Sequence, residues 1–232
     1  MTMADFQFKQ FGIRQDRCAM KVGTDGVLLG AWAEGGARIL DIGTGTGLVA
    51  LMMAQRFPEA RVVGIDLDAG ACAQAGENVA GSPFAGRVDV VHCALQEYDG
   101  GSAFDAIVSN PPFFVDSLKN PDGKRAMARH ADSLPFRDLF RGVDRLLSAD
   151  GVFSAIVPAE VLERFVAESC VSGFFLVRKC GVKTVARKAP KRYLLSFARH
   201  RAGVADERVE IMTDSAGNRS PWYAEITEEF YL

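Results

Sequence analysis

The chain has 232 residues, of which 48% are hydrophobic and 24% charged, and this length and composition fit one α/β domain with a sizeable core rather than a disordered chain. The net charge of −2 excludes a polycation, so any surface that binds nucleic acid must be a local patch. The five scattered cysteines form no CxxC pair, residues 1–10 hold no signal-peptide core and no apolar run is long enough to span a membrane, so we expect a cytoplasmic protein with reduced thiols and no metal site.

Residues 1–36 are predicted to form a lead-in segment before the regular part of the chain. Residues 1–20 show little periodicity. A short helix is predicted to begin near Gly26 with Thr24 or Asp25 as its cap, because the side-chain oxygens of these residues accept hydrogen bonds from the first amides of a helix. We expect this helix to cover the sheet that follows.

From residue 38 onward, apolar strands alternate with helices. Strands are predicted over residues 38–42, 61–65, 87–92, 104–109, 151–157, 174–180 and 193–200. Helices are predicted over residues 48–56, 69–80, 136–147 and 160–172. The alternation predicts a mostly parallel seven-stranded sheet with helices on both faces. Because no helix separates the last two strands, they can form an antiparallel hairpin at one edge. We expect one domain over residues 1–232.

A glycine-rich loop joins the first strand of this series to its helix. Gly43, Gly45 and Gly47 recur at every second position of this loop, directly after Asp41. Glycines let the backbone turn tightly and let a ligand approach it closely. Ligands of an open parallel sheet bind beyond the carboxyl ends of its strands, where the amides of a helix start favour polar groups.

The spacing of these glycines separates two classes of cofactor. Nicotinamide and flavin enzymes use GxGxxG, but Leu48 stands where the third glycine would fall. The observed spacing, with an acid just before it, is typical of enzymes that bind S-adenosylmethionine (SAM), in which the loop faces the methionine part of the cofactor. Asp66, at the end of the next strand, is placed to accept both ribose hydroxyls.

A stiff corner, Ser109-Asn110-Pro111-Pro112-Phe113, follows the strand over residues 104–109. Both prolines fix their φ near −65° and push the preceding residue out of the helical region. The corner presents the amide of Asn110, the carbonyl of Pro111 and the ring of Phe113, which together could hold a planar group that carries an NH2. The alternative is a turn that ends a strand and leaves its phenylalanine exposed.

The glycine loop, the acid and the Asn-Pro-Pro-Phe corner resemble the class I SAM-dependent methyltransferases that methylate planar amines, namely adenine N6 in nucleic acids and a glutamine side-chain amide. More closely, the chain is similar to the bacterial tRNA1(Val) adenosine-N6 methyltransferases. Residues 16–32, Asp-Arg-Cys-Ala-Met-Lys-Val-Gly-Thr-Asp-Gly-Val-Leu-Leu-Gly-Ala-Trp, resemble the N-terminal signature of that family, and residues 229–232 resemble its tail. The resemblance therefore covers nearly the whole chain.

The resemblance implies a Rossmann-like class I methyltransferase fold, SAM as cofactor, tRNA as partner, and the N6 of the adenosine just 3′ of the anticodon in a valine tRNA as the acceptor. The implied catalytic residues are Asn110, Pro111 and Phe113. The implied cofactor-binding residues are Asp41, Gly43, Gly45, Gly47, Asp66, Leu67, Cys93, Ala94, Asn110, Lys21 and Thr24. The lead-in segment, residues 1–36, is expected to pack on the cofactor site.

The chain departs from the pattern of the family in two places. The family usually ends the corner in tyrosine, whereas this chain has Phe113, which keeps the stacking surface without the hydroxyl. Many class I enzymes also carry an acid after the third strand for the adenine amine of the cofactor, but here Cys93 and Ala94 occupy that place. Adenine recognition is then left to backbone groups and apolar contact.

The corner suits the chemistry of an exocyclic aromatic amine, which is a poor nucleophile because its lone pair is delocalised into the ring. The side-chain oxygen of Asn110 and the carbonyl of Pro111 can accept the two amine hydrogens, so that catalysis is mainly positioning and charge stabilisation. Phe113 would stack on the base, which must be turned out of the folded RNA to reach the corner. No metal or catalytic nucleophile is required.

Two basic clusters could form the RNA surface. The first comprises Arg178, Lys179, Lys183, Arg187, Lys188, Lys191 and Arg192. The second comprises Lys119, Lys124, Arg125, Arg129 and His130, within a polar stretch over residues 114–134 that we expect to form a substrate loop. The residues predicted to contact RNA phosphates are Arg125, Arg129, Arg187, Lys188, Lys191 and Arg192. The alternative for each is a solvated loop.

Two other functions stay open. A protein-glutamine N5 methyltransferase that acts on a release factor would use the same corner, but such enzymes usually carry a separate N-terminal helical domain, for which a glycine loop at residue 43 leaves no room. A non-catalytic SAM-fold protein could bind RNA alone. Asn110 beside an aromatic ring argues against this second alternative, because degenerate members tend to lose that corner.

Overall fold

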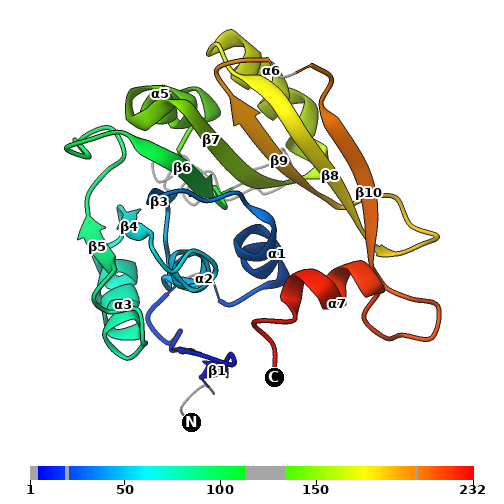
Figure 1. Cartoon of the computed structure of the whole chain (residues 1–232), viewed down its shortest axis with the longest axis horizontal. Helices are drawn as coiled ribbons and strands as arrows, with labels where there is room; N and C mark the ends of the chain where they lie inside the picture. Colours follow the sequence, from blue (N-terminus) through cyan, green and yellow to red (C-terminus); the bar gives the residue numbers. More distant parts are fainter. Residues whose placement is uncertain (1–4, 19–20, 113–133, 202) are drawn as a thin grey trace, which may run out of the picture.

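An eight-stranded sheet with helices on both faces forms the centre of the computed structural model, which describes residues 5–18, 21–112, 134–201 and 203–232 (Figure 1). The strands follow one another in the sheet in the order β10-β8-β9-β7-β6-β3-β4-β5. Their bounds are β3 Arg38–Ile42, β4 Arg61–Asp66, β5 Val88–His92, β6 Phe104–Ser109, β7 Leu147–Pro158, β8 Phe175–Val185, β9 Arg192–Ala198 and β10 Asp206–Thr213. A separate small hairpin pairs β1 (Phe6–Gln7) with β2 (Gly12–Ile13).

The sheet is parallel from β5 to β7, and β9 runs antiparallel to both β7 and β8. These findings confirm the predicted parallel sheet and the predicted antiparallel pair. The structure differs in having an eighth strand, because β10 pairs parallel to β8 and lies outside the pair. Asp206-Glu207-Arg208 opens this exposed strand, so its sequence lacks the apolar alternation that marks a half-buried strand.

Helices cover both faces of the sheet. One face carries α1 (Thr24–Trp32), α2 (Leu48–Arg56), α3 (Ala69–Ala80) and, beside β10, α7 (Pro221–Thr227). The other carries α5 (Phe136–Leu146) and α6 (Leu162–Val171), which follows the short 3-10 turn η1 (Ala159–Val161), as Figure 1 shows. None of the helices in the described ranges is long and apolar enough to cross a membrane.

Each face has its own apolar core. On the α5 face, the buried ring of Phe140 lies 5.5 Å from that of Phe153, 5.1 Å from that of Phe165 and 5.6 Å from that of Phe197, measured between centroids. On the α1 face, buried Leu29 and the methionines of α2 belong to a second cluster. Because both faces of the central strands are buried, the carboxyl ends of these strands are held on a rigid base.

The start of α1 corrects one prediction from the sequence. The helix begins at Thr24 with Gly23 as its N-cap and no side-chain cap, so neither Thr24 nor Asp25 has the predicted capping role. The carboxylate of Asp25 instead accepts a hydrogen bond from Arg192, at the start of β9. The side chain is therefore turned toward another element and not back onto its own helix.

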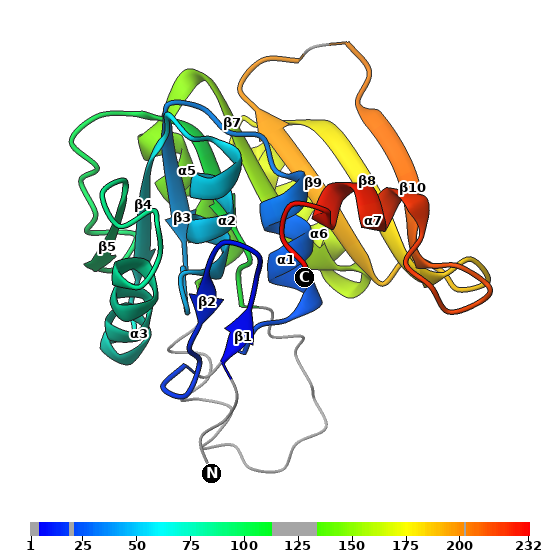
Figure 2. The same cartoon turned by 60° about the horizontal axis from the view of Figure 1, so that its bottom comes forward.

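The N-terminal hairpin packs against residues close to the C-terminus (Figure 2). The amide of Lys9 donates to the carbonyl of Phe230 at 2.8 Å, and its ammonium group donates to the carbonyl of Glu228 at 2.6 Å. The rings of Phe8 and Tyr231 stack with centroids 5.9 Å apart. Phe8 and Phe230 are buried, so this contact extends the core of the α1 face.

Candidate active site

The glycine loop between β3 and α2 has the backbone that its sequence predicts. Gly43, Gly45 and Gly47 have φ angles of 72°, 55° and 81°, which residues with a side chain rarely adopt. The amides of Gly43 and Thr44 both donate to the carbonyl of Ile65, at 2.9 and 3.0 Å. The loop is therefore fixed to the end of β4, and a side chain at position 43 would meet open space.

Asp41 lies beneath this loop, with only 2% of its surface exposed. One carboxylate oxygen accepts hydrogen bonds from the hydroxyl of Thr44 at 2.7 Å and from the amide of Ala50 at 3.1 Å. Burial raises the pKa of Asp41 to about 7, although both hydrogen bonds act in the opposite direction. Sequence analysis predicted that Asp41 contacts the cofactor. In the structure its side chain is buried and binds Thr44 of the glycine loop and the amide of Ala50.

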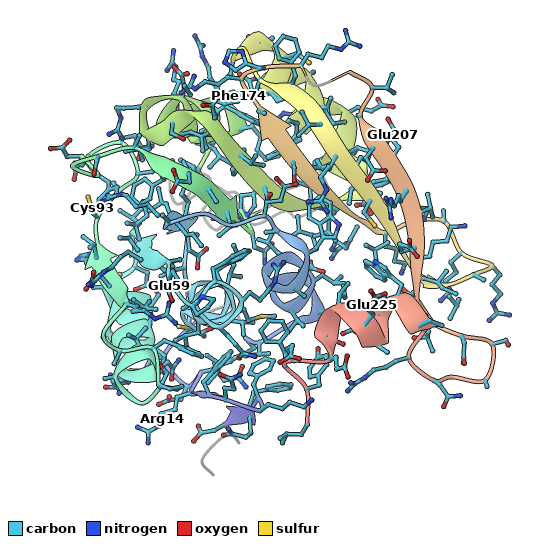
Figure 3. The ribbon with its side chains drawn as sticks, in the orientation of Figure 1. Arg14, Glu59, Cys93, Phe174, Glu207 and Glu225 are labelled. Carbon is cyan, nitrogen blue, oxygen red and sulfur yellow. The ribbon has the colours of Figure 1, made fainter. Side chains whose placement is uncertain are left out.

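Asp66, at the end of β4, connects three segments. One oxygen of its carboxylate accepts a hydrogen bond from the amide of Gly45 at 2.8 Å, and the other accepts one from the amide of Asp68 at 2.9 Å. Its backbone carbonyl accepts a hydrogen bond from the amide of Cys93 at 3.0 Å. The structure thus brings the loop after β3, the acid after β4 and the segment after β5 together. Cys93, in the last of these segments, is labelled in Figure 3.

Leu67, directly after Asp66, is 60% exposed. Its carbonyl contacts a ring nitrogen of His92 at 3.0 Å, so its backbone is tied to the end of β5. Ala94 is half-buried after the same strand. Leu67 and Ala94 therefore offer an apolar surface next to Asp66, at the place where the family pattern would have an acid.

The Asn-Pro-Pro corner begins directly after β6, beside the end of β3. Ser109 is opposite Ile42 in the parallel pair of β6 and β3, and its hydroxyl donates to the carbonyl of Ile42 at 2.9 Å. Asn110 is half-buried and Pro111 is buried immediately after this anchor. Asn110 follows the end of β6 and Gly43 follows the end of β3, and these two strand ends are paired with each other. Phe113 lies outside the described residues.

Two buried amides on α3 bind the lead-in segment, and sequence analysis missed both. The oxygen of the Asn78 side chain accepts a hydrogen bond from the amide of Arg14 at 2.9 Å, and its nitrogen donates to the carbonyls of Arg14 at 2.9 Å and Thr46 at 2.8 Å. The side chain of Gln74 accepts from the amide of Arg17 at 3.1 Å. The only sequence signal was their spacing of four, which puts two amides on one helix face.

Lys21 and Thr24, the two lead-in residues that were predicted to bind the cofactor, are both exposed. The ammonium group of Lys21 donates to the carbonyl of Gln15, and Thr24 is the first residue of α1. They follow Arg14 and Arg17, whose backbone is bound by Asn78 and Gln74 of α3. Asn78 also binds Thr46 of the glycine loop.

The family model described as "Methyltransferase small domain" matches residues 22–134 of the chain. A protein of Bacteroides thetaiotaomicron named tRNA1(Val) (adenine(37)-N6)-methyltransferase is 48% identical over 231 residues, which make up 98% of this chain and 97% of that protein. A protein of Aeromonas hydrophila with the same name is 44% identical over 232 residues, 98% of this chain and 97% of its own. The chain belongs to the tRNA1(Val) (adenine(37)-N6)-methyltransferase family.

Solved structures agree with the class I methyltransferase fold of this family member. A predicted O-methyltransferase from Agrobacterium tumefaciens superposes with a TM-score of 0.69 over 89% of this chain and 96% of its own, at 18% identity. A glycopeptide N-methyltransferase solved in complex with SAM superposes with a TM-score of 0.58 over 78% of this chain and 100% of its own, at 12% identity. At these identities the likeness shows the fold alone.

The structure divides the first basic cluster of this family member. Arg187, Lys188 and Lys191 are exposed in the connection between β8 and β9, which we call the basic loop (residues 186–191). Arg192 is opposite Pro158, the last residue of β7, so the basic loop lies at the same end of the sheet as Asn110. Arg125, Arg129 and the rest of the predicted substrate loop over residues 114–134 lie outside the described residues, apart from Leu134.

Three other cations of that cluster are engaged elsewhere. Arg192 donates to Asp25 at 2.7 Å, and Lys179 donates to Glu207 at 2.8 Å. The guanidinium of Arg178 lies over the ring of Trp32, 4.1 Å from its centroid. Arg178 also forms an ion pair with Glu34, two residues after Trp32. Arg187, Lys188 and Lys191, the exposed cations of the cluster, therefore all lie in the basic loop.

No group of three or more His, Cys, Asp and Glu side chains that could hold a metal ion occurs in the described parts of the chain.

Proposed function

We propose that this chain transfers the methyl group of SAM to the N6 of adenosine 37 in a valine tRNA. The observation that carries the proposal is the placement of Asn110 and Pro111 directly after β6, next to the paired end of β3 that Gly43 follows, in a chain 48% identical to a protein named for this reaction. The substrate implies that the protein acts in the cytoplasm.

The residues after β3, β4 and β5 suit the parts of SAM. Gly43 leaves open space where a side chain would stand, and the adjacent loop can take the methionine part against its backbone. The Asp66 carboxylate can accept the ribose hydroxyls in addition to the amides that it already binds, because each carboxylate oxygen has two lone pairs. Leu67, Cys93 and Ala94 offer apolar contact and backbone groups to the adenine, while Lys21 and Thr24 approach from the lead-in side. When bound, SAM supplies a methyl group activated by a positive sulfur.

The corner acts on the adenine amine by position. The side-chain oxygen of Asn110 and the carbonyl of Pro111 accept its two hydrogens, which draws the lone pair away from the ring and toward the methyl group. The same two oxygens stabilise the positive charge that grows on the nitrogen, and the extra proton then passes to solvent. Phe113 is proposed to stack on the base, a contact worth about 1–3 kcal/mol.

We propose that the basic loop, with Arg187, Lys188 and Lys191, contacts phosphates of the tRNA, together with Arg125 and Arg129. The exposure of the first three and their location at the carboxyl end of the sheet support this role. We also propose that residues 1–232 act as one domain in which residues 1–36 pack on the cofactor site. The hydrogen bonds from Asn78 to Arg14 and Thr46 support that packing.

The test is methyl incorporation from labelled SAM. Total tRNA from a strain without the endogenous activity is the substrate, a release factor is offered in parallel, and the labelled tRNA is digested to nucleosides. N6-methyladenosine at position 37 of a valine tRNA is the expected product. Label in the release factor would instead support the glutamine methyltransferase, and SAM binding with no label in either would support a non-catalytic protein.

A further inference from the structure

An ion pair joins two segments that are distant in the sequence but both close to the proposed site. The guanidinium Nε of Arg192 donates to a carboxylate oxygen of Asp25 at 2.7 Å, across 167 residues of sequence. The side chain of Arg192 is 37% exposed and that of Asp25 is 30% exposed, so the pair is partly shielded from water. A second nitrogen of the guanidinium donates to the carbonyl of Lys191 at 3.0 Å. One arginine thus binds Asp25 and the end of the basic loop at once.

Asp25 belongs to the cofactor side of the molecule. It lies in the first turn of α1, directly after Thr24, which is proposed to contact SAM. Its carboxylate is turned toward Arg192 and not back onto the first turn of α1, so it is available as an anchor for this cation. Upstream, the same segment is held on α3 and the glycine loop through Arg14 and Asn78.

Arg192 belongs to the substrate side. It is the first residue of β9 and follows the basic loop directly. Lys191 is fixed by its backbone, because its amide donates to Val182 at 3.0 Å and its carbonyl accepts from Ala159 at 3.1 Å. The base of the loop is therefore tied to β8 and to the turn after β7, while the Asp25 pair ties it to α1.

We propose that the Asp25–Arg192 pair fixes the position of the basic loop relative to α1 and the cofactor site. When the loop binds phosphates of the tRNA, this fixed position brings the adenine to the methyl group. The inference rests on the proposed function and deepens it. Arg192 then acts through the loop, and its guanidinium is not itself a phosphate contact. Arg187, Lys188 and Lys191 supply the charge that attracts the RNA.

This role differs from direct phosphate binding in the expected effect of Asp25. If Arg192 bound a phosphate, the Asp25 carboxylate would compete with the RNA, and Asp25→Asn would strengthen tRNA binding. If the pair positions the loop, Asp25→Asn and Arg192→Gln both weaken tRNA use, and the double variant is no worse than either single variant. The signs of the two effects therefore separate the two roles.

The experiment measures steady-state methylation of the valine tRNA by the full chain and the variants Asp25→Asn, Arg192→Gln and both together. We expect KM for tRNA to rise about tenfold in all three, equivalent to about 1.4 kcal/mol, with KM for SAM and the melting temperature nearly unchanged. Glu207→Gln is the matched control, because it breaks an ion pair with Lys179 on the same sheet, and KM for tRNA should not change.

The salt dependence of tRNA binding is the second measurement. A lost phosphate contact lowers the slope of log affinity against log salt by about one, whereas a lost positioning contact leaves the slope unchanged. Opposite signs for the two single variants, or a lower slope in Arg192→Gln, would overturn the positioning role while the enzyme stays active. If the unaltered chain does not methylate tRNA, the proposed function itself fails, so the two failures are distinct.

Discussion

The carboxylate of Asp66 accepts a hydrogen bond from the amide of Gly45 at 2.8 Å, so a single side chain joins the acid after β4 to the glycine loop after β3. The two features recognised separately in the sequence are therefore one unit, in which a change at the acid is also a change in the loop.

Asp66→Ala should lower SAM affinity about 10- to 100-fold, because it removes an ionised acceptor for the ribose and releases the amide of Gly45. Calorimetric titration with SAM measures the effect. The control is Asp68→Ala, which removes the cap that accepts from Gly70 at 2.8 Å and should cost about 1 kcal/mol of stability with little change in SAM affinity. Equal losses in both variants would show that Asp66 acts only through the start of α3.

Asn78→Ala should loosen the lead-in segment. It removes three hydrogen bonds, of which the one to the carbonyl of Thr46 is buried and the two to the backbone of Arg14 are partly buried, and it should cost about 2–4 kcal/mol in the free energy of unfolding. Urea unfolding measures this cost, and trypsin cleavage after Arg14 or Arg17 should become faster. The control Glu77→Gln breaks only an exposed ion pair with Arg17, so unfolding should change by less than about 1 kcal/mol.

Gly64→Ala should damage the cofactor loop from the neighbouring strand. A Cβ at position 64 would lie 2.6 Å from the hydroxyl oxygen of Thr44, and the displaced hydroxyl would lose its bond to Asp41. We expect weaker SAM binding and lower stability. Gly76→Ala on α3 is the control, since nothing lies within 4 Å of its added Cβ and alanine favours the helix by about 1 kcal/mol. Similar losses of SAM affinity in both variants would contradict the role of Thr44.

The raised pKa of Asp41 predicts a pH-dependent stability. The folded protein keeps a proton on this carboxyl up to about pH 7, whereas the unfolded chain releases it near pH 4. The free energy of unfolding should therefore fall as pH rises between these values, by up to about 4 kcal/mol, and should level off above pH 7. Asp41→Asn cannot titrate, so denaturant titrations from pH 4.5 to 8 should show this fall only in the unaltered chain. If the free energy of unfolding falls equally with pH in both proteins, Asp41 is not the cause of the fall.

Asn110→Ala should lower the rate of methyl transfer about 100- to 1000-fold, because the side chain holds the acceptor amine. The affinity for SAM should stay nearly unchanged. A tritium assay and calorimetry on the same preparation separate the two quantities. Asn110→Asp keeps an oxygen acceptor and should retain more activity than the alanine variant. Loss of SAM binding in Asn110→Ala would instead assign this residue to the cofactor.

The part of the fold that positions the site could be predicted from the sequence because its signals are local. The bounds of β3, α2, α3 and β6 match the predicted ranges, since each of these buried elements has a clear apolar pattern between breaks. The charged edge strand β10 and the two-residue strands of the N-terminal hairpin have no such pattern. Tertiary contacts alone reveal them.

The candidate site shows the same division. The glycines, Asp66 and Asn110 were recognised because each follows a predicted strand end. Asn78 was missed, because its partners Arg14 and Thr46 become neighbours only after the sheet has formed. The pairing of Arg192 with Asp25 was missed for a related reason, since a basic residue beside a basic loop gives no sign of a carboxylate 167 residues away.

The contact between the N-terminal hairpin and Phe230 also affects how the chain matures on the ribosome. Lys9 binds a residue 219 positions later, so the contacts of the hairpin with the C-terminal residues form only when nearly the whole chain has been made, whereas the ring of Phe11 can pack against Phe84 much earlier. The chain is made from its N-terminus, and apolar surface that stays uncovered while the rest of a domain is made is exposed to aggregation in the interval. The ring of Phe8, which stacks on Tyr231 in the folded protein, therefore lacks this neighbour until residues 221–231 have been made.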